Sequence, residues 1–360
     1  MSSVSELHRF LAKWQRASQP VDVFGPLAAP QEEVLRRRYR ELANAVHPDR
    51  YRRGSEAALA TQAFQLLQGW HAWAQRQIKA GHYGSAVRFS IASARAIYHC
   101  AGEPIRGDLA DLYHAEAANG GGALLKIVRR PSNNDLMERE AMILAHLYQR
   151  LEADPLRAHF PTLQESFLCR DAQGAQRRIN VLSVEADCHA LNAVTQRYPH
   201  GLHPADAAWM FNRLLAALAV THQAGLVHGA VLLDHLLIRP EDHNGILIDW
   251  CYAVPIGEKI RAICPAHDAD YPPEVLARRP ATPATDLYMA ARVMARLLGS
   301  ADGSADALPR HLPAALTAFL RGCLLPSPSH RPNDAWALFD DFQTLLKKLY
   351  GPPSFRPFSI

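Results

Sequence analysis

The chain has 360 residues, a length that suits two domains of ordinary size better than one. Hydrophobic residues make up 48% and charged residues 21%, as is typical of a globular protein with an apolar core. No apolar run reaches the ~18 residues that span a bilayer, the N-terminus lacks the apolar stretch of a signal peptide, and the 6 cysteines include no CxxC pair. These features exclude a membrane-spanning protein, argue against a structural zinc site or a disulfide-stapled fold, and predict a cytoplasmic protein.

The net charge of +4 is unevenly distributed along the chain. Residues 1–84 carry 12 Lys and Arg against 7 Asp and Glu, and the remainder of the chain is close to neutral. A basic patch of this size suits an acidic protein partner as well as it suits a nucleic acid.

Three helices are predicted in the first quarter of the chain. Residues 1–19 include one short amphipathic segment. Residues 31–46 place apolar side chains three or four positions apart, with arginines on the opposite face. Pro48 ends this second helix because proline donates no amide hydrogen bond and disfavours helical geometry at residue 47. A further apolar series from Ala63 to Ile78 predicts a partner helix, so that the two form an antiparallel hairpin.

The order of short motifs in this region is informative. Asp22-Val23-Phe24 precedes the basic helix, His47-Pro48-Asp49 follows it directly, and the second helix comes next. In this arrangement residues 20–84 resemble the J-domain of DnaJ-type co-chaperones. The resemblance implies binding of a DnaK-type chaperone and stimulation of its ATPase, through His47, Pro48, Asp49, Arg36, Arg37 and Arg40. The alternative is a plain helical hairpin with a proline stop and a solvated arginine face.

The pattern changes after residue 85. Residues 123–128 form an apolar strand interrupted by Lys126, and a buried strand accommodates a lysine only when an anion meets it. The helix predicted over residues 135–150 offers Glu138 and Glu140 as partners. Two short apolar segments follow much later, and Asp249 stands directly after the second, where a carboxylate can hold a metal ion.

These pieces, in this order, resemble the protein-kinase fold over about residues 98–348. The matching motifs are Leu125-Lys126-Ile127, Glu138 to Ala141, Val227-His228-Gly229, Asp249-Trp250-Cys251, Tyr271 to Glu274, Asp286-Leu287-Tyr288 and Ser329 to Pro332. The resemblance implies structural roles for His228 and for Asp286, which would accept hydrogen bonds from the catalytic loop. It also implies a buried bidentate ion pair between Glu274 and Arg331.

Departures from the kinase pattern decide the predicted function. The position of the catalytic aspartate is Ala230, that of the following lysine is Leu232, and that of the metal-binding asparagine is His235, a poor ligand for a hard cation. Of the glycine-rich loop only Gly107 is retained. Loss of a positioned base alone removes about 10²–10⁴-fold in rate. We therefore expect a pseudokinase without catalytic residues. Asp234 is the single weak substitute for the base, and capping or solvation of a turn is the interpretation we favour for it.

Nucleotide binding is a separate question. The residues that could still hold ATP are Gly107, Lys126, Glu140 and the hinge residues Glu185 and Asp187, with Asp249 as a ligand for Mg²⁺. The other interpretation is a structural ion-pair network in a closed cleft. No cofactor is required by this prediction; ATP and Mg²⁺ would bind weakly.

The predicted architecture is multidomain, α and α+β. Its parts are a short N-terminal helix (1–19), a J-domain (20–84), a linker (85–97), a kinase-like domain with a β-rich N-lobe (98–185) and a helical C-lobe (186–348), and a proline- and aromatic-rich tail (349–360). The tail is predicted either to dock on the C-lobe, to serve as a linear motif, or to be disordered.

The combination predicts an adaptor. The kinase-like part would bind a specific protein partner or ligand, and the J-domain would recruit the chaperone, with neither a nucleic acid nor a membrane as partner. The alternatives are an atypical ATP-dependent kinase or nucleotidyl transferase using Asp249 with Asp234 or Asp242, and a scaffold whose HPD motif has no remaining role.

Overall fold

The computed structural model describes residues 3–360 except 18, 30, 52–53, 80, 82, 85–86 and 119. It is a mixed structure of helices and antiparallel strands that divides into two compact units. The first unit contains the chain up to Arg129 together with Phe167–Val184, and the second contains Arg130–Ser166 and Glu185–Ile360. Within the described part of the chain, no helix is long and apolar enough to cross a membrane.

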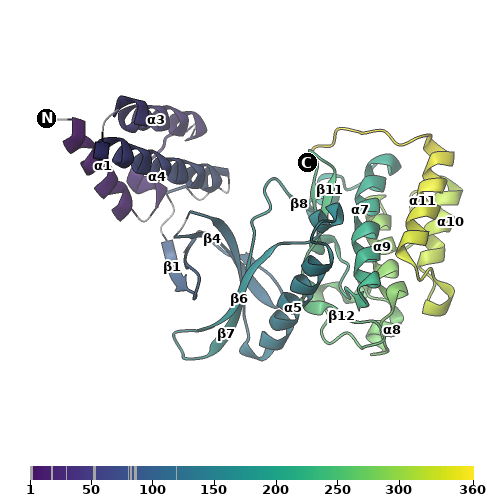
Figure 1. Ribbon diagram of the computed structural model, residues 1–360. Coiled ribbons are helices and arrows are strands. Elements are labelled where there is room, and N and C mark those ends of the chain that lie inside the picture. Colours follow the sequence, from purple (N-terminus) through teal and green to yellow (C-terminus); the bar gives the residue numbers. More distant parts are fainter. Residues whose placement is uncertain are drawn as a thin grey trace. The chain divides into compact units, whose positions relative to one another are not determined.

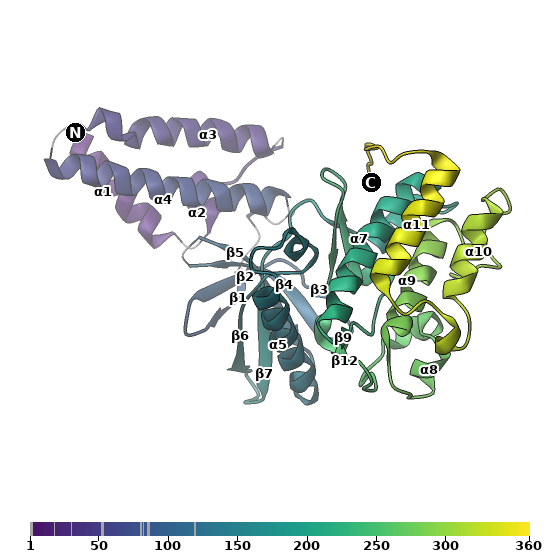
Figure 2. The ribbon, with the colours of Figure 1, turned by 45° about the vertical axis from the view of Figure 1, so that its right-hand side comes forward.

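Four helices form the first part of unit one: α1 (Ser3–Arg16), α2 (Pro20–Phe24), α3 (Gln31–Val46) and α4 (Gly54–Lys79). The helix predicted over residues 31–46 is confirmed, and it ends directly before the turn at Pro48–Arg50, as proline requires. Helices α3 and α4 lie side by side (Figures 1 and 2). Their apolar faces share one core with α1 and α2, which buries Leu7, Leu11, Trp14, Val23, Phe24, Leu35, Val46, Ala63, Leu67 and Ala74.

A curled antiparallel sheet forms the rest of unit one. Its strands are β1 (Val87–Ala92), β2 (Ile97–Ala101), β3 (Ile105–Arg106), β4 (Ala110–Ala117), β5 (Gly122–Val128), β6 (Leu163–Arg170) and β7 (Gln176–Leu182). The order along the sheet is β1-β2-β4-β5-β7-β6, and β3 pairs with β4. Alternate residues of β5 face the apolar core of one sheet face, where Ala123 and Leu125 are buried beside Val181 of β7.

Two features of unit one differ from the sequence prediction. Strand β1 occupies much of the range 85–97 that was expected to be a linker, because it pairs with β2, with a register shift between residues 87 and 89. Residues 85–86 lie outside the described part of the chain. The helices and the sheet, expected as separate domains, form one compact unit. Arg76 of α4 forms an ion pair with the buried Glu116 of β4 and donates to the carbonyl of Gly120 at 3.0 Å.

Unit two is mainly helical. Its helices are α5 (Asn134–Arg150), α6 (Leu191–Arg197), α7 (Pro204–Gln223), α8 (Pro273–Leu276), α9 (Pro283–Leu297), α10 (Ala314–Cys323) and α11 (Ala335–Tyr350), and its short strands are β8 (His189–Ala190), β9 (Leu226–Val227), β10 (Leu236–Arg239), β11 (Asn244–Leu247) and β12 (Val254–Pro255). Helix α7 is buried along most of its length, with α9 and α11 packed beside it (Figure 2). Short 3-10 turns, η4 (Leu233–His235), η5 (Trp250–Tyr252) and η6 (Pro265–Asp270), connect these elements.

Helix α5 belongs to unit two. Residues 130–166, which lie within the range 98–185 predicted as an N-lobe, are grouped with that unit. The reason is the contact between the buried face of α5 and the turn η5, which contains the fully buried Trp250. The predicted hinge over residues 184–187 coincides with the point where the chain passes into unit two.

Candidate functional site

The tripeptide His47-Pro48-Asp49 forms a tight turn at the end of α3. The Asp49 amide donates to His47 Nδ1 at 3.3 Å, and the imidazole packs edge-on against Phe64 of α4, with 5.3 Å between ring centroids. The hydroxyl of Tyr51 donates to the carbonyl of Ala45 at 3.0 Å. These contacts fix the turn, while 86% of the Asp49 side chain remains exposed. The three residues are therefore presented on a rigid support.

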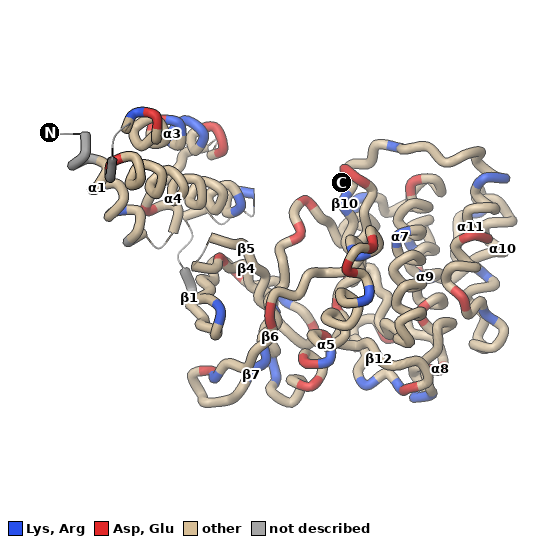
Figure 3. Tube along the Cα trace, in the orientation of Figure 1, with Lys and Arg blue, Asp and Glu red and all other residues tan. Residues whose placement is uncertain are grey.

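Helix α3 carries the basic face that the sequence indicates (Figure 3). The predicted site residues Arg36, Arg37 and Arg40 are exposed. Arg38 differs from them because its guanidinium donates to the carbonyl of Phe24 at the end of α2. One arginine of the run thus has a structural role, and three are available at the surface.

The sheet of unit one holds two of the residues predicted to bind nucleotide. Gly107 lies in the turn between β3 and β4, where a Cβ atom would approach the Ala110 carbonyl oxygen to 2.6 Å. The retention of this glycine is therefore explained by the turn itself. Lys126 lies in β5 with 3% of its surface exposed, opposite the fully buried Asn180 of β7. The sequence-based expectation of a lysine within a buried strand is confirmed.

The remaining predicted nucleotide-binding residues belong to unit two. Glu140 lies in α5 and is 1% exposed. Glu185 and Asp187 lie in the segment before β8. Burial raises the pKa of Glu185, an effect that Arg239 opposes. Asp187 has a left-handed backbone with φ of 56°.

The loop at residues 228–235, which was predicted to correspond to a kinase catalytic loop, is anchored by Asp286 of α9. The backbone amides of His228 and Gly229 donate to the two Asp286 carboxylate oxygens at 2.7 and 2.9 Å, which confirms the predicted scaffold role. The ring of His228 bonds to the carbonyl of Ile248 at 3.0 Å, a contact with the backbone that agrees with a structural role. Burial lowers the pKa of His228 to about 4, and this ring is therefore neutral at pH 7.

The positions that would carry catalysis are apolar or already bonded. Ala230 and Leu232 are 0% and 1% exposed. Asp234 lies 3.3 Å from Nε2 of His267, and its hydrogen bond with His267 lowers its pKa. This contact joins η4 to η6. Hydrogen bonds to the carboxylates of Asp234 and Asp270 raise the pKa of His267 to about 9.

His235 occupies the position of the metal-binding asparagine and bridges two groups of the loop. Its Nδ1 lies 2.8 Å from the carbonyl oxygen of Ala230, and its Nε2 lies 3.1 Å from Oδ2 of Asp249. The ring is buried and lies nearly parallel to Tyr252, with 5.8 Å between centroids. Asp249 itself has a left-handed backbone, with φ of 68° and ψ of 52°.

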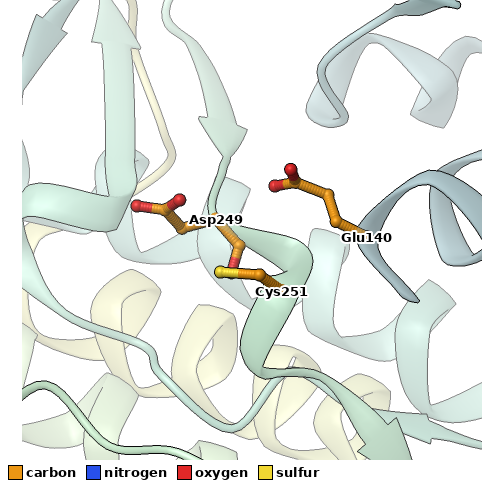
Figure 4. Close-up of side chains that lie close together, drawn as sticks. All are labelled: Glu140, Asp249 and Cys251. Atoms are coloured by element: carbon orange, nitrogen blue, oxygen red, sulfur yellow. The ribbon is translucent and has the colours of Figure 1, made fainter. Parts of the chain in front are cut away.

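Asp249 also lies near Glu140 and Cys251, and one ligand atom of each of the three residues lies within 4.8 Å of the others (Figure 4). Two of the three donors are carboxylates, the ligand type that Mg²⁺ prefers, and the third is a buried thiol, a soft ligand. One Asp249 oxygen also lies 3.1 Å from Nε2 of His235. The role of Asp249 as a magnesium ligand stays a prediction.

The predicted ion pair between Glu274 and Arg331 is confirmed. Arg331 donates from Nη1 to Oε1 at 2.7 Å and from Nη2 to Oε2 at 3.0 Å, and both side chains are buried. The pair joins α8 to the segment before α11 and has an architectural role.

Two features of unit two were not predicted from the sequence. One is the ion-pair network of His267 and Asp270, in which Asp270 also binds Arg296 at 2.9 Å. The i,i+3 spacing of His267 and Asp270 was the only local signal. The other is the surface that the tail contacts. Docking of the tail was one of the three alternatives that the sequence left open.

The C-terminal tail docks on α7 and the β10–β11 turn. Arg356 donates to both carboxylate oxygens of Asp206, at 2.6 and 3.3 Å, and its carbonyl bonds to Nε2 of His243 at 2.9 Å. The His243 ring stacks between Trp209 and Phe355, at centroid distances of 4.2 and 4.3 Å. The groups of α7 and of the β10–β11 turn that contact the tail lie more than 100 residues before it in the sequence. No local pattern therefore indicates this docking.

Comparison with protein-family models and with curated proteins gave no match, so the two resemblances rest on the residues of this chain alone.

Proposed function

We propose that this protein is a J-domain adaptor whose kinase-like part has no phosphotransferase activity. The N-terminal helices would recruit a DnaK-type chaperone, and the second part would bind a specific partner protein or ligand. The second half of this proposal is supported by the hydrogen bonds of the segment that runs from His228 to Asp249. Its anchor, Asp286, is retained, whereas the position of the base is the buried methyl group of Ala230.

The first half of the proposal is supported by the turn at residues 47–49. Its backbone is fixed by contacts with α3 and α4, and the exposed Asp49 side chain stands at the end of a helix with three exposed arginines. A rigid turn beside a basic face provides specific polar contacts together with attraction for an acidic surface. Because the groups are pre-organised, little conformational entropy is lost when a partner binds.

The pseudokinase interpretation is supported by the contacts of the carboxylates that catalysis would need. General-base catalysis requires a carboxylate within hydrogen-bond reach of the substrate hydroxyl. The nearest candidate in the sequence, Asp234, is bonded to His267. Asp249, the expected metal ligand, is bonded to His235. Neither of these contacts depends on a substrate.

The test is single-turnover ATP hydrolysis by a DnaK-type chaperone in the presence of the full chain. We expect the wild type to accelerate hydrolysis and His47→Gln to abolish the acceleration. His8→Gln, an exposed substitution of the same chemistry in α1, serves as the matched control and should behave as the wild type. Absence of stimulation by the folded wild-type protein would overturn the co-chaperone half of the proposal.

A second candidate function is ATP-dependent group transfer by a rearranged site. It is favoured by the convergence of Glu140, Asp249 and Cys251 within 4.8 Å. Incubation with ATP labelled on the α- or the γ-phosphate distinguishes nucleotidyl from phosphoryl transfer. Labelled product that disappears in Asp249→Ala would establish this function, and absence of label from candidate proteins and from the chain itself would exclude it.

A further inference from the structure

We infer that the surface of unit two that contacts the C-terminal tail is a peptide-docking groove, and that the tail is a tethered occupant which a partner protein displaces. The partner would supply a non-helical segment with an arginine between two aromatic side chains, the pattern of residues 355–358 in the tail. The inference rests on one part of the proposed function, the binding of a partner protein by unit two. It does not depend on the loop from residue 228 to residue 249 or on the chaperone.

Four side chains of unit two form this surface, which we call the tail groove. Tyr198 follows α6 directly, Asp206 and Trp209 lie in α7, and His243 lies in the β10–β11 turn. The tail leaves the end of α11 and runs back to α7 and β11 (Figure 1). It is therefore seated on a surface to which the helix directly before it contributes none of these four side chains.

Hydrogen bonds of the groove recognise one arginine and two backbone carbonyls. The Asp206 carboxylate accepts both bonds from the Arg356 guanidinium, at 2.6 and 3.3 Å, a bidentate geometry that a lysine cannot reproduce. His243 Nε2 lies 2.9 Å from the Arg356 carbonyl oxygen, and the Tyr198 hydroxyl donates to the Ser359 carbonyl at 2.8 Å. Because the two carbonyl bonds need no particular side chain, the arginine carries the specificity of this set.

Aromatic contacts flank the arginine on both sides. The Phe355 ring stacks on His243 with 4.3 Å between centroids. Phe358 packs against Tyr198 and Trp209, at centroid distances of 5.7 and 6.1 Å. Such pairs contribute beyond the apolar area that they bury. The occupant of the groove is thus defined as an arginine with an aromatic residue directly before it and another two positions after it.

The tail is held mainly by groups that solvent reaches. Phe355 is 64% exposed, and the Arg356 side chain is 45% exposed. Screening by water and salt keeps the contribution of such an ion pair small. The tail occupies the groove because its tether keeps it at a high effective concentration there, and not because each contact is strong. A partner segment with additional contacts can therefore replace it.

A cavity next to the groove offers those additional contacts. It has a volume of about 240 Å³ and lies between α7, α11 and residues 350–354, with Trp209 and Asn212 in its lining. Among the described residues, Nε1 of Trp209 and Oδ1 of Asn212 are buried atoms that have no hydrogen-bond partner. Leaving such a donor and such an acceptor unbonded is unfavourable. A partner that displaces residues 351–354 and supplies an acceptor and a donor here gains two bonds that the tail does not make.

The first experiment measures binding of the tail sequence in trans. The probe is a fluorescein-labelled peptide with the sequence of residues 351–360, and its fluorescence anisotropy reports binding to the full chain. Arg356→Glu places a like charge beside Asp206 and should release the tethered tail, so this variant should bind the probe about fivefold more tightly than the wild type. Because residue 356 lies in an exposed terminal segment, the substitution should leave folding unchanged.

The controls use Arg356→Glu as the background. A further Asp206→Asn substitution should weaken probe binding about fivefold, whereas Asp341→Asn, an exposed substitution in α11, should leave it unchanged. A probe with glutamate in place of its arginine should also bind about fivefold more weakly. Absence of probe binding to Arg356→Glu, or binding that Asp206→Asn does not weaken, would overturn the inference.

The second experiment separates an exchangeable tail from a permanent strap that stabilises unit two. An amidated form of the peptide, which resists carboxypeptidase, should accelerate the release of the C-terminal residues from the wild-type chain several-fold. An unchanged rate at a peptide concentration that saturates Arg356→Glu would establish the permanent strap. In light scattering, a concentration-dependent wild-type dimer that Arg356→Glu abolishes would assign the groove to the tail of a second copy and overturn the assignment to a partner protein.

These outcomes are independent of the chaperone assay. Stimulation through His47 without peptide binding would overturn the inference alone. Peptide binding without stimulation would overturn only the co-chaperone half of the proposed function.

Discussion

The buried pair of Glu274 and Arg331 permits a quantitative test of how the second unit is stabilised. The Arg331 side chain is 0% exposed and that of Glu274 is 3% exposed. Besides its two bonds to the carboxylate, the guanidinium donates to the carbonyls of Leu325, Pro326 and Ala284, at 2.5, 2.8 and 3.4 Å. The Thr285 hydroxyl also donates to the carboxylate, at 3.2 Å. Each substitution in this cluster therefore removes a countable set of interactions.

Replacing Arg331 with methionine should be the more damaging single change. Removing one partner of a buried ion pair costs about 3–5 kcal/mol, and we expect the upper end because three carbonyls lose a donor as well. Glu274→Gln keeps an acceptor oxygen and should cost about 3 kcal/mol. The double variant contains no uncompensated charge, so its cost should fall below that of Arg331→Met alone. The resulting coupling energy is therefore larger than about 3 kcal/mol.

Native-state hydrogen exchange of the α8 and α9 peptides measures these costs in the second unit alone. Arg321→Met is the matched control, because the ion pair of Arg321 with Asp306 is exposed on both sides, at 57% and 89%. Its cost should stay below about 1 kcal/mol. If the cost of the double variant equals the sum of the costs of the two single variants, the argument is refuted, because the partners of one ion pair are coupled.

Three further predictions concern charge and the tail. Hydrogen bonds, of which that to Asp234 is the strongest, raise the pKa of His267 from 6.5 to about 9. The stabilisation is complete below pH 6.5 and is lost as the pH rises through 9, so the unfolding temperature should fall over this interval in the wild type and less in His267→Gln. Burial raises the pKa of Glu116 from 4.5 to about 7, so that between these pH values the folded state retains a proton that the unfolded state has released. The stability of the wild type should therefore fall as the pH rises from 4.5 to 7, and that of Glu116→Gln should not. Asp206→Asn removes the carboxylate that accepts both bonds from Arg356, and release of the C-terminal residues by carboxypeptidase, followed by mass spectrometry, should become several-fold faster; an unchanged rate would show that this pair does not hold the tail.

The local elements of the chain could be predicted because their causes are local. The apolar spacing over residues 31–46 and the proline at position 48 define one helix and its end without any distant contact. The strand over residues 122–128 is recognisable from its apolar residues on both sides of Lys126. Strand β1 was missed because its pairing with β2, rather than any pattern within it, explains its conformation.

The long-range contacts divide into two classes. The bonds of Asp286 with the loop at residues 228–229 and the pair of Glu274 with Arg331 join residues 57 or 58 positions apart. They could be predicted because an ordered set of motifs implies them. The docking of Arg356 on Asp206, 150 residues apart, was not predictable, because it depends on which surface of the folded unit two is left for the tail.

The contacts of Asp234 and Asp249 bear on the proposal that this part of the chain has no phosphotransferase activity. A catalytic group must direct its hydrogen-bonding capacity toward the reacting atoms, so that the interaction strengthens in the transition state. In this chain Asp234 is bonded to His267 and Asp249 to His235, two contacts between protein groups that are complete without a substrate. To act on a substrate, either carboxylate would first have to break its existing bond, and that cost would be added to the reaction barrier. The same contacts join the loop to the turn η6 and to the strand end before η5, and they thus give the replaced positions a structural role.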